Sequence, residues 1–146
     1  MANIYVRSTD GSNADNGSTW ALSKLDLVGA AAIDAAGDNI YVSDNHAEST
    51  AATITIALAG SNASPVKIIC GDDSAEPPTA AATTGTVTTT GNSNISFTGT
   101  NYYVYGLRFN VGTGAVNATI APVSTASAQA TFDSCTFNCV ATGSGT

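Results

Sequence analysis

The segments Val104-Tyr105-Gly106-Leu107-Arg108-Phe109 and Phe132-Asp133-Ser134-Cys135-Thr136-Phe137 decide the expected fold. Both run in the order apolar, polar, small, apolar, polar, apolar, and the second follows the first by 28 residues. A repeat of this length, with one apolar ladder in each copy, is typical of solenoids in which each repeat stacks on the next. The two segments therefore favour a parallel solenoid over a β-sandwich.

The apolar positions inside each segment do not alternate strictly. Two residues separate the first apolar position from the second, and one residue separates the second from the third. A bend at Gly106 and at Ser134 brings all three to one face, because small residues, glycine above all, tolerate left-handed backbone. We then expect Leu107 to stack on Cys135, and Phe109 to stack on Phe137, inside the protein.

Further strands are expected on the C-terminal side of Gly37, where short β-rich segments alternate with turns made of Gly, Asn, Asp and Pro. The residues after Gly37 suffice for about four turns of a solenoid at roughly 25 residues each. The predicted strands cover residues 39–43, 53–58, 66–70, 86–90, 95–98, 102–111, 118–120 and 130–140.

The N-terminal region has a different pattern. Residues 3–6 alternate like a short strand, and residues 9–18 (TDGSNADNGS) form a dense turn segment. From residue 19 or 20 to residue 36, apolar side chains recur at three- and four-residue spacing, with Gly37 as a helix stop. We expect one amphipathic helix here, lying across the first turn of the solenoid and closing that end. Its apolar face would consist of Leu22, Leu25, Val28, Ala32, Ile33 and Ala36.

Charge is scarce and unevenly placed. The 146 residues carry eleven acidic and four basic side chains, a net charge of −7, and only 10% of residues are charged. Phosphate or anionic-lipid binding needs clustered Lys and Arg, so this balance argues against nucleic acid and membrane surfaces as partners. Between Pro77 and Thr146 the charged residues are Arg108 and Asp133 alone. We expect this nearly neutral half to face other protein.

The chain opens without the basic region and apolar stretch of a signal peptide, and no run approaches the roughly 18 apolar residues of a membrane span. These features predict synthesis in a cytoplasm without secretion by a signal peptide. Three cysteines, an odd number without dense spacing, fit a reducing compartment. In one extended segment Cys135 and Cys139 would lie roughly 13 Å apart at about 3.3 Å per residue, too far for a disulfide. We expect free core thiols, Cys70 included.

Residues 3–42 combine Ile4-Tyr5-Val6, a loop rich in Gly, Asn and Asp, an Ala-rich segment, and Gly37-Asp38-Asn39-Ile40-Tyr41-Val42. In this order they resemble the N-terminal entry of the pectin-lyase-like right-handed parallel β-helix superfamily. Gly106-Leu107-Arg108-Phe109 and Ser134-Cys135-Thr136-Phe137 are similar to the coil repeat of that superfamily. The resemblance covers most of the chain, although no proline precedes the helical segment as in a typical member.

A second likeness concerns Val42-Ser43-Asp44-Asn45-His46-Ala47-Glu48 and the later Pro65-Val66-Lys67-Ile68-Ile69-Cys70. These segments resemble uncharacterised bacteriophage structural proteins. The resemblances imply an all-β protein, a right-handed single-stranded parallel β-helix with an N-terminal capping α-helix. Residues 1–38 would form the strand, loop and capping helix. Residues 39–146 would form the coils of one continuous domain, which continues beyond residue 146 or packs on another subunit.

The function implied by these likenesses is that of a non-enzymatic structural protein of a bacteriophage virion: capsid decoration, head fibre, or the base of a tail fibre or spike. Its partners would be other virion proteins and copies of itself in a homo-oligomer, without cofactor, nucleic acid or membrane. Two alternatives stay open. One is the N-terminal part of a polysaccharide-degrading β-helix spike or lyase. The other is a bacterial surface adhesin, against which the missing signal peptide counts.

No residue is expected to be catalytic or to bind a metal. Glycosidases need two carboxyl groups facing each other across the sugar, and the predicted coils after residue 77 supply only Asp133, which we expect to form a surface ion pair with Arg108. His46, the only histidine, is predicted to be a surface or turn residue. Cys135 and Cys139 have no partner pair for zinc.

Two polar groups offer oxygen ligands for calcium or, in the second group, paired carboxylates. The first lacks the spacing of an EF-hand, so we expect its side chains to bond their own backbone in a tight loop. The second, just before Pro77-Pro78, is expected to be a solvated acidic loop. The groups are Asp10, Asn13, Asp15 and Asn16, and Asp72, Asp73 and Glu76.

The candidates for contact with a partner protein are Tyr103, Tyr105 and Arg108. In an alternating strand Tyr103 and Tyr105 share one face, while Tyr102 and Val104 share the other. Outward tyrosines beside an arginine suit a protein or sugar surface. Scattered surface tyrosines over an ordinary core are the simpler interpretation.

Overall fold

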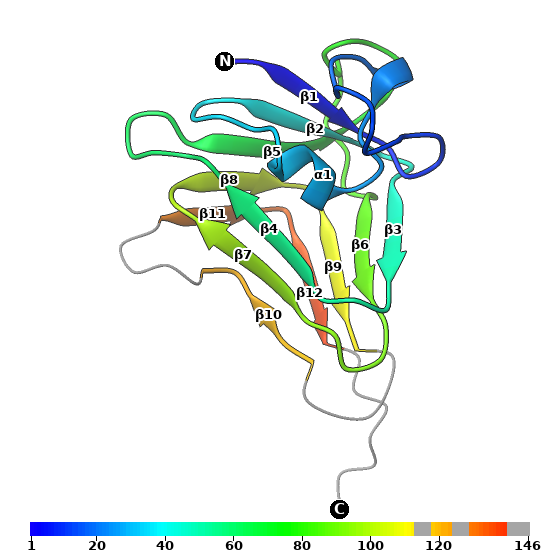
Figure 1. The fold of residues 1–146 in the computed structure, drawn as a ribbon, viewed down its shortest axis with the longest axis vertical. Coiled ribbons are helices and arrows are strands. Elements are labelled where there is room, and N and C mark those ends of the chain that lie inside the picture. The colour runs from blue at the N-terminus through cyan, green and yellow to red at the C-terminus, as the bar shows by residue number, and fades with distance from the viewer. Residues whose placement is uncertain (113–117, 124–128, 140–146) are drawn as a thin grey trace, which may run out of the picture.

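The computed structural model describes residues 1–112, 118–123 and 129–139 (Figure 1). This part of the chain is mostly β-strand, with short helical segments only near the N-terminus. All the strand pairs are parallel, which confirms the prediction of a β-rich protein with parallel pairing. The strands are β1 (Asn3–Val6), β2 (Asn39–Ser43), β3 (Ala47–Thr50), β4 (Ile54–Leu58), β5 (Val66–Gly71), β6 (Thr86–Thr89), β7 (Ile95–Gly99), β8 (Tyr102–Tyr105), β9 (Arg108–Val111), β10 (Ile120–Ala121), β11 (Ala130–Asp133) and β12 (Thr136–Cys139).

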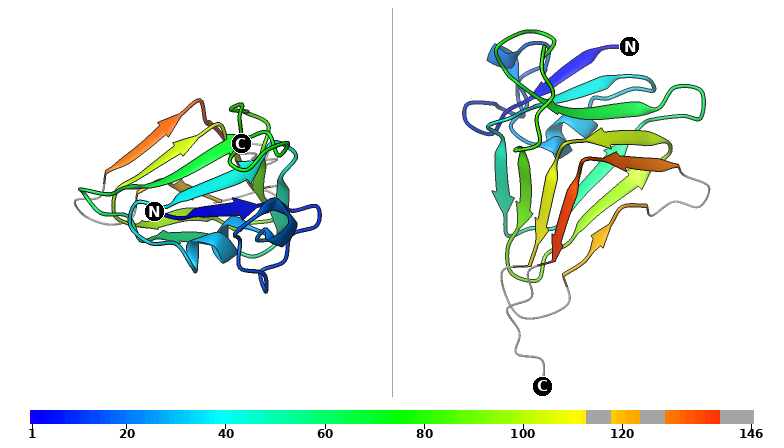
Figure 2. Two further views of the ribbon diagram at one scale, coloured as in Figure 1. Left: turned by 90° about the horizontal axis from the view of Figure 1, so that it is seen from above. Right: turned by 180° about the vertical axis from the view of Figure 1, so that it is seen from behind.

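The strands form three sheets, which the chain visits in rotation. Their orders are β1-β2-β5-β8-β11, β3-β6-β9-β12 and β4-β7-β10. Strands β2, β3 and β4 thus belong to three different sheets, and β5, β6 and β7 repeat this order. We refer to each pass through the sheets as a level: β2–β4 form level 1, β5–β7 level 2, β8–β10 level 3, and β11 with β12 level 4. Figure 2 shows the sheets surrounding a common interior from two further directions.

Alternating burial along the strands builds the core. In β4, Ile54, Ile56 and Leu58 are buried, while the residues between them are exposed. Residues in register at successive levels stack, so that Ile54 lies beside Ile95 and Ile56 beside Phe97. These side chains are at most 2% exposed. Because burying such a side chain contributes about 1.5–3 kcal/mol, the interior ladders are the main source of stability.

The predicted bends are confirmed. Gly106 has φ +77° and Ser134 has φ +52°, both in the left-handed region, and each interrupts what would otherwise be one long strand. A Cβ at Gly106 would lie 2.1 Å from the Ala82 carbonyl oxygen, so glycine is required there for space as well as for conformation. The predicted register is also confirmed, since Phe109 pairs with Phe137.

The spacing between levels is less regular than predicted. In the first sheet, Asn39 pairs with Lys67, an offset of 28 residues, but Val66 pairs with Tyr102, an offset of 36. Tyr102 then pairs with Ala130, again 28 residues on. The longer offset spans residues 72–85, which connect β5 to β6. The 28-residue repeat is therefore not a fixed period.

The single helix expected between residue 19 or 20 and residue 36 is wrong. A 3-10 turn, η1 (Trp20–Leu22), and a short helix, α1 (Leu27–Ala31), take its place, and Asp26 caps α1. Between them, Lys24 forms a parallel β-bridge with Val6. The backbone of Lys24 bonds to the first strand, and this pairing competes successfully with helical hydrogen bonds.

The apolar face expected in this region is not the face that is buried. Helix α1 contacts β1 and β4, and its buried residues are Leu27, Ala30 and Ala31. The large apolar side chains assigned to the buried face are 41–44% exposed: Leu22, Leu25, Val28 and Ile33.

The helices within the described ranges are too short to span a membrane.

The sequence pattern does not predict β3, because Ala-Glu-Ser-Thr lacks the β-branched apolar residues typical of strands. The strand nevertheless pairs with β6 over its whole length. Its inward position at level 1 holds Glu48, which is in register with Val87 of level 2, itself in register with Phe109 of level 3. An acidic side chain thus occupies a place that apolar residues take at every deeper level.

Candidate protein-interaction surface

The strands β10, β11 and β12 form one end of the described structure (Figure 1). Each is the last strand of its sheet and pairs with a described strand on one side only. Edge strands of this kind present backbone N–H and C=O groups that can pair with another chain. We refer to these three strands, with the side chains of Phe132, Phe137 and Cys139, as the open end.

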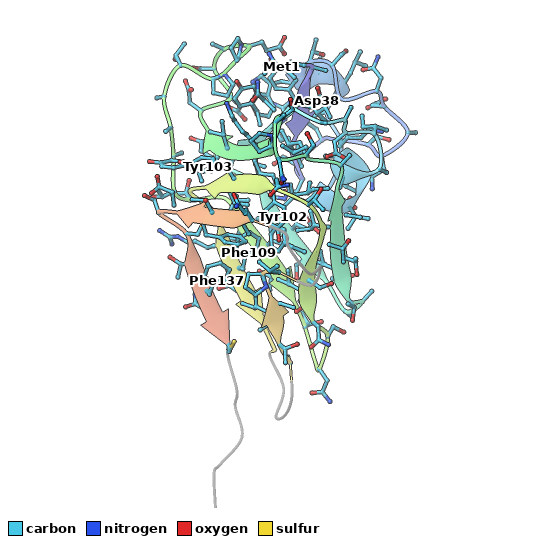
Figure 3. The ribbon with its side chains drawn as sticks, turned by 90° about the vertical axis from the view of Figure 1, so that its left-hand side faces the viewer. Met1, Asp38, Tyr102, Tyr103, Phe109 and Phe137 are labelled. Atoms are coloured by element: carbon cyan, nitrogen blue, oxygen red, sulfur yellow. The ribbon has the colours of Figure 1, made fainter. Side chains whose placement is uncertain are left out.

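The inward side chains of the open end show what is lost when no further level covers them. Phe137 stacks on Phe109 with 5.4 Å between ring centroids (Figure 3). Phe109 is fully buried, whereas Phe137 is 41% exposed. The two residues are in register in neighbouring strands. The exposure of Phe137 therefore follows from its place in the stack.

An aromatic cluster connects the open end to the interior. Phe132 lies 5.1 Å from Phe137 and 5.3 Å from Phe97, both in edge-to-face arrangement. Such ring pairs contribute about 0.5–1.5 kcal/mol beyond burial. Phe97 also contacts Phe109 at 5.4 Å. The core thus continues to the surface at this end, where exposed large apolar side chains are typical of interaction sites.

The three cysteines become more exposed toward the open end. All are free, as expected. Cys70 is buried and Cys135 is partly buried, and desolvation raises the pKa of both thiols. The prediction that Cys139 lies in the core is wrong, because it is exposed at the edge formed by β12.

The predicted contact residues Tyr103, Tyr105 and Arg108 lie on two sheets. The two tyrosines occupy half-buried outward positions of β8, with Tyr102 and Val104 buried on the inner face as expected. The Tyr103 hydroxyl donates to Asp133 at 2.9 Å, and partial desolvation together with this bond raises the Tyr103 pKa. Arg108 begins β9 in the neighbouring sheet and is exposed. The structure therefore does not gather the three into one patch.

The ion pair expected between Arg108 and Asp133 does not form. Arg108 Nε donates instead to the carbonyl of Thr83 at 3.0 Å. Asp133 accepts hydrogen bonds from Tyr103 and from the Ser134 hydroxyl, the latter at 3.0 Å. Arg108 lies on the other side of the bend between two sheets, a separation that a 28-residue offset does not reveal.

The acidic group at residues 72–76 is not a freely solvated loop. The Glu76 carboxylate accepts the N–H of Trp20 at 2.5 Å, and the Trp20 indole donates to the carbonyl of Ala75 at 2.9 Å. Asp73 accepts from the Ser43 hydroxyl at 2.9 Å. The segment thus fastens η1 to β2. Asp72 accepts from Ser74, Thr79 and Ala80, and these bonds, that from Ser74 most, lower its pKa.

His46 was predicted to be a surface or turn residue. It ends the turn after β2, where its N–H donates to the carbonyl of Ser43 at 3.0 Å, but it does not lie on the surface. It is 1% exposed, with Nε2 3.3 Å from Glu48 Oε2 and Nδ1 without a hydrogen-bond partner. It directly precedes β3, so its side chain faces inward like that of Glu48. Because β3 was not expected, the alternation that buries His46 was missed.

The prediction that the side chains of the N-terminal polar loop bond their own backbone holds for Asn16, whereas Asp10 and Asn13 bond other side chains. Arg7 binds the Asp10 carboxylate at 2.5 Å, and Asn16 accepts from the backbone of Ser18 at 2.9 Å. Asn13 donates to Asp26 at 2.8 Å. Among the described residues, no three His, Cys, Asp or Glu side chains gather as a metal site would require.

Comparisons with family models, with curated proteins and with solved structures return no match for this chain. The physical features of the open end, and the resemblances noted in the sequence, are therefore the basis for assigning a function. Phe132, Phe137 and Cys139 were missed as surface residues. No sequence signal identifies them as such, because the 28-residue repeat does not show whether another level follows its second copy.

Proposed function

We propose that the chain is a right-handed parallel β-helix of the pectin-lyase-like superfamily, closed at its N-terminal end by α1. Support comes from the way the chain passes in turn through three parallel sheets. It also comes from the inward apolar side chains, which stack on one another through the four levels. The Gly37–Val42 stretch that carries the resemblance begins at the turn before β2 and continues through it. In this proposal each level is one coil.

We further propose that the protein is a non-enzymatic structural component of a bacteriophage virion, acting as capsid decoration, head fibre, or the base of a tail fibre or spike. Its partners are copies of itself and other virion proteins. The observation that carries the interaction role is the open end, where Phe137 continues the core ladder into solvent. The virion assignment rests on the sequence resemblances.

The chemistry of the sides of the molecule supports assembly. Arg108 and Asp133 are the charged residues of the second half, and each already has a polar partner. Desolvating an unpaired charge in an interface costs several kcal/mol, so surfaces with few charges are easier to bury. Apart from Arg108, polar but uncharged side chains line the outer face of β9 and β12, where Asn138 donates to Asn110 at 2.8 Å.

The surroundings of Asp133 support a role other than sugar hydrolysis on this face of the molecule. Hydrolysis needs two carboxyl groups across one site. On the outer face of the first sheet, Asp133 is in register with Tyr105, which is in register with Ile69 and Tyr41. Its oxygens accept from Tyr103 and Ser134. This ladder supplies aromatic and aliphatic neighbours instead of a second acid.

Sedimentation velocity of the 146-residue protein over a range of concentrations tests the interaction role. We expect species heavier than the 14.5 kDa monomer, and Phe137→Lys should shift them to the monomer, because a charge would be buried in the contact. Ala57→Lys, at an exposed outward position of β4, is the matched control and should change little. A wild-type protein that stays monomeric throughout contradicts self-assembly through the open end.

Imaging of native particles tests the virion role. Antibody-labelled negative-stain images should show the protein at regular positions on phage particles. Depolymerisation of bacterial capsule or pectin by the purified chain would contradict the non-enzymatic assignment. That outcome would favour the polysaccharide-degrading alternative.

A further inference from the structure

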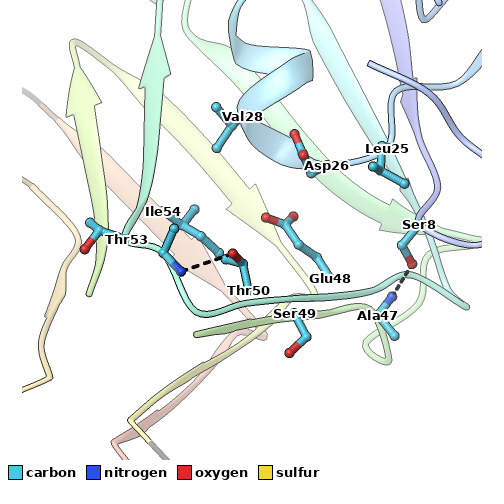
Figure 4. Close-up of a pocket in the computed structure, with 11 residues that line it drawn as sticks. Ser8, Leu25, Asp26, Val28, Ala47, Glu48, Ser49, Thr50, Thr53 and Ile54 are labelled. Atoms are coloured by element: carbon cyan, nitrogen blue, oxygen red, sulfur yellow. Dashed lines mark hydrogen bonds between the residues drawn. The ribbon is translucent and has the colours of Figure 1, made fainter. Parts of the chain in front are cut away.

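A cavity of about 500 Å³ lies between α1 and the β3–β4 corner, at the closed end of the molecule (Figure 4). It is distant in the fold from the open end and plays no part in the proposed assembly. Two carboxylates, those of Asp26 and Glu48, and three apolar side chains, those of Leu25, Val28 and Ile54, are among the residues that line it. Figure 4 shows the Glu48 carboxylate directed from the strand toward the helix. The Asp26 carboxylate lies at the start of α1, where it accepts the N–H of Gly29 at 2.6 Å and the amide of Asn13 at 2.8 Å.

The Glu48 side chain is the most unusual feature of this cavity. It is 9% exposed and occupies an inward position that Val87 and Phe109 take at deeper levels. Its Oε2 atom accepts the N–H of Leu27 at 3.2 Å and lies 3.3 Å from His46 Nε2. Its Oε1 atom receives no hydrogen bond from the described residues. This oxygen is accessible from the cavity, which Glu48 lines. Placing a carboxylate at a position that is apolar at deeper levels costs desolvation free energy, so packing alone does not account for an acid here.

His46 holds this carboxylate in place. Its ring is fully enclosed, and Nε2 is directed at Glu48 while Nδ1 has no partner. Oε2 is held by two contacts, one with the N–H of Leu27 in α1 and one with the ring of His46, which directly precedes β3. The remaining oxygen is left toward the cavity. The group is therefore arranged to accept a donor that the described residues do not provide.

Two of the four basic side chains, Arg7 and Lys24, are engaged elsewhere. Arg7 pairs with Asp10 and Asp73, and the Lys24 ammonium donates to the carbonyl of Asn13 at 3.0 Å. Among the described ion pairs, neither Glu48 nor Asp26 has a lysine or arginine partner. The cavity thus concentrates negative charge in a chain that is already acidic.

The cavity walls decide which cation fits. Leu25 and Val28 line one wall of the cavity, and their side chains are 41% and 42% exposed. Ile54, which is buried, lines the opposite wall. Methylene groups pack on such walls, whereas a bare divalent cation gains nothing from them. Calcium also needs six to eight oxygen ligands, and the described residues gather no group of three metal-binding side chains. An ammonium group has three donors, of which one matches Glu48 Oε1 and the others are left for water at the open side of the cavity.

We propose that this cavity binds a primary alkylammonium group, with Glu48 as the principal ion-pair partner and Leu25, Val28 and Ile54 as the surface for its carbon chain. The group can come from a free aliphatic amine or from a lysine side chain of a protein. Both sources present the same chemistry to the cavity.

Titration of the isotope-labelled 146-residue protein, followed by NMR of its backbone amides, tests this proposal. n-Butylammonium should shift the amide signals of Leu27 and Ala52, which lie beside Glu48 and at the cavity rim. Butan-1-ol, its neutral isostere, should bind at least about tenfold more weakly, because a charge-assisted bond is lost. Equal binding of the two compounds, or shifts located elsewhere, would overturn the proposal.

Two variants identify the partner residue. Glu48→Gln should weaken n-butylammonium binding by about tenfold or more, while Asp133→Asn, which removes one charge at the far end, should leave it unchanged. Equal weakening by both would show a general charge effect and contradict the site. If Glu48→Gln does not fold, the comparison with butan-1-ol on the wild-type protein still decides. Calcium chloride that shifts the same signals at lower concentration than n-butylammonium would also overturn the proposal.

A further arm distinguishes the sources. N-acetyl-lysine methylamide carries a lysine side chain in a peptide setting, and butane-1,4-diamine represents free amines. Tighter binding of the lysine derivative assigns the site to a protein partner, and tighter binding of the diamine assigns it to a free amine. Failure of both to bind contradicts the proposal, and it leaves the proposed assembly through the open end untouched.

Discussion

The inward-facing positions of the strands hold different kinds of residue at the two ends of the molecule. At the N-terminal end, α1 covers level 1, and the inward positions beside it hold His46 and Glu48. At the open end the inward positions hold Phe132 and Phe137, with no described element over them. Polar residues thus lie inside where α1 covers them and donates a hydrogen bond. Aromatic residues lie inside at the open end, where no described element covers them. The difference supports the proposal that an apolar surface of another chain covers the open end.

The largest effect is expected where the ladder is complete. Phe109→Ala should lower the free energy of unfolding by about 3–5 kcal/mol, because it leaves a cavity among fully buried rings. Phe137→Ala should cost only about 1–2 kcal/mol in the monomer, since its ring is partly in solvent already. Denaturant unfolding at low concentration measures both. Equal losses would remove the distinction between the interior and the open end.

The cover at the opposite end is tested by Leu27→Ala. Leu27 is the first residue of α1 and is fully buried, so we expect a loss of about 2–4 kcal/mol in unfolding free energy. Val28→Ala, one residue along and 42% exposed, should cost less than about 0.5 kcal/mol. Similar small losses for both would mean that α1 does not seal level 1.

A pH titration tests whether solvent reaches the ladder from the open end. Tyr102, at level 3, is 3% exposed, and desolvation raises its pKa to about 12 from an ordinary 10. A raised pKa favours the protonated folded state, so this stability is fully present below pH 10 and is lost as pH rises to about 12. The loss should reach about 2–3 kcal/mol. Alkaline unfolding of Tyr102→Phe should show a shallower decline, and an unchanged slope would indicate that water already reaches level 3.

The smallest effect is expected on the side between the two ends. Arg108→Ala removes an exposed side chain with a single hydrogen bond, to Thr83, and should change the free energy of unfolding by less than about 0.5 kcal/mol. Thermal or denaturant unfolding provides the measurement. A decrease of more than about 1 kcal/mol in the free energy of unfolding would contradict this, because it would mean that the side surface also contributes substantially to stability.

Parts of this contrast could be predicted from the sequence. The 28-residue repeat gave the pairing of Phe109 with Phe137 and the bends at Gly106 and Ser134, because both depend on local parity and on residue size. The same repeat did not predict that Phe137 would be exposed. Exposure depends on whether another level follows, and a pairwise repeat carries no such information.

The site features at the closed end were beyond sequence reasoning for a physical reason. Helical spacing over residues 19–36 ignored the bridge from Lys24 to Val6, a contact between segments far apart in the pattern. The polar sequence of β3 concealed the burial of His46 and Glu48. Only the three-dimensional register with Val87 shows that these polar residues stand in the core ladder.

Alkylation of Cys139 in the native protein tests the central claim, that protein covers the open end. Cys139 is exposed in the single chain, whereas Cys70 is buried and serves as the internal reference. At concentrations where the protein assembles, Cys139 should be protected from a thiol reagent and become reactive again on dilution or in Phe137→Lys, as measured by mass spectrometry of the labelled peptides. A Cys139 that reacts as fast as a free cysteine at every concentration, while Cys70 stays protected, would contradict the claim.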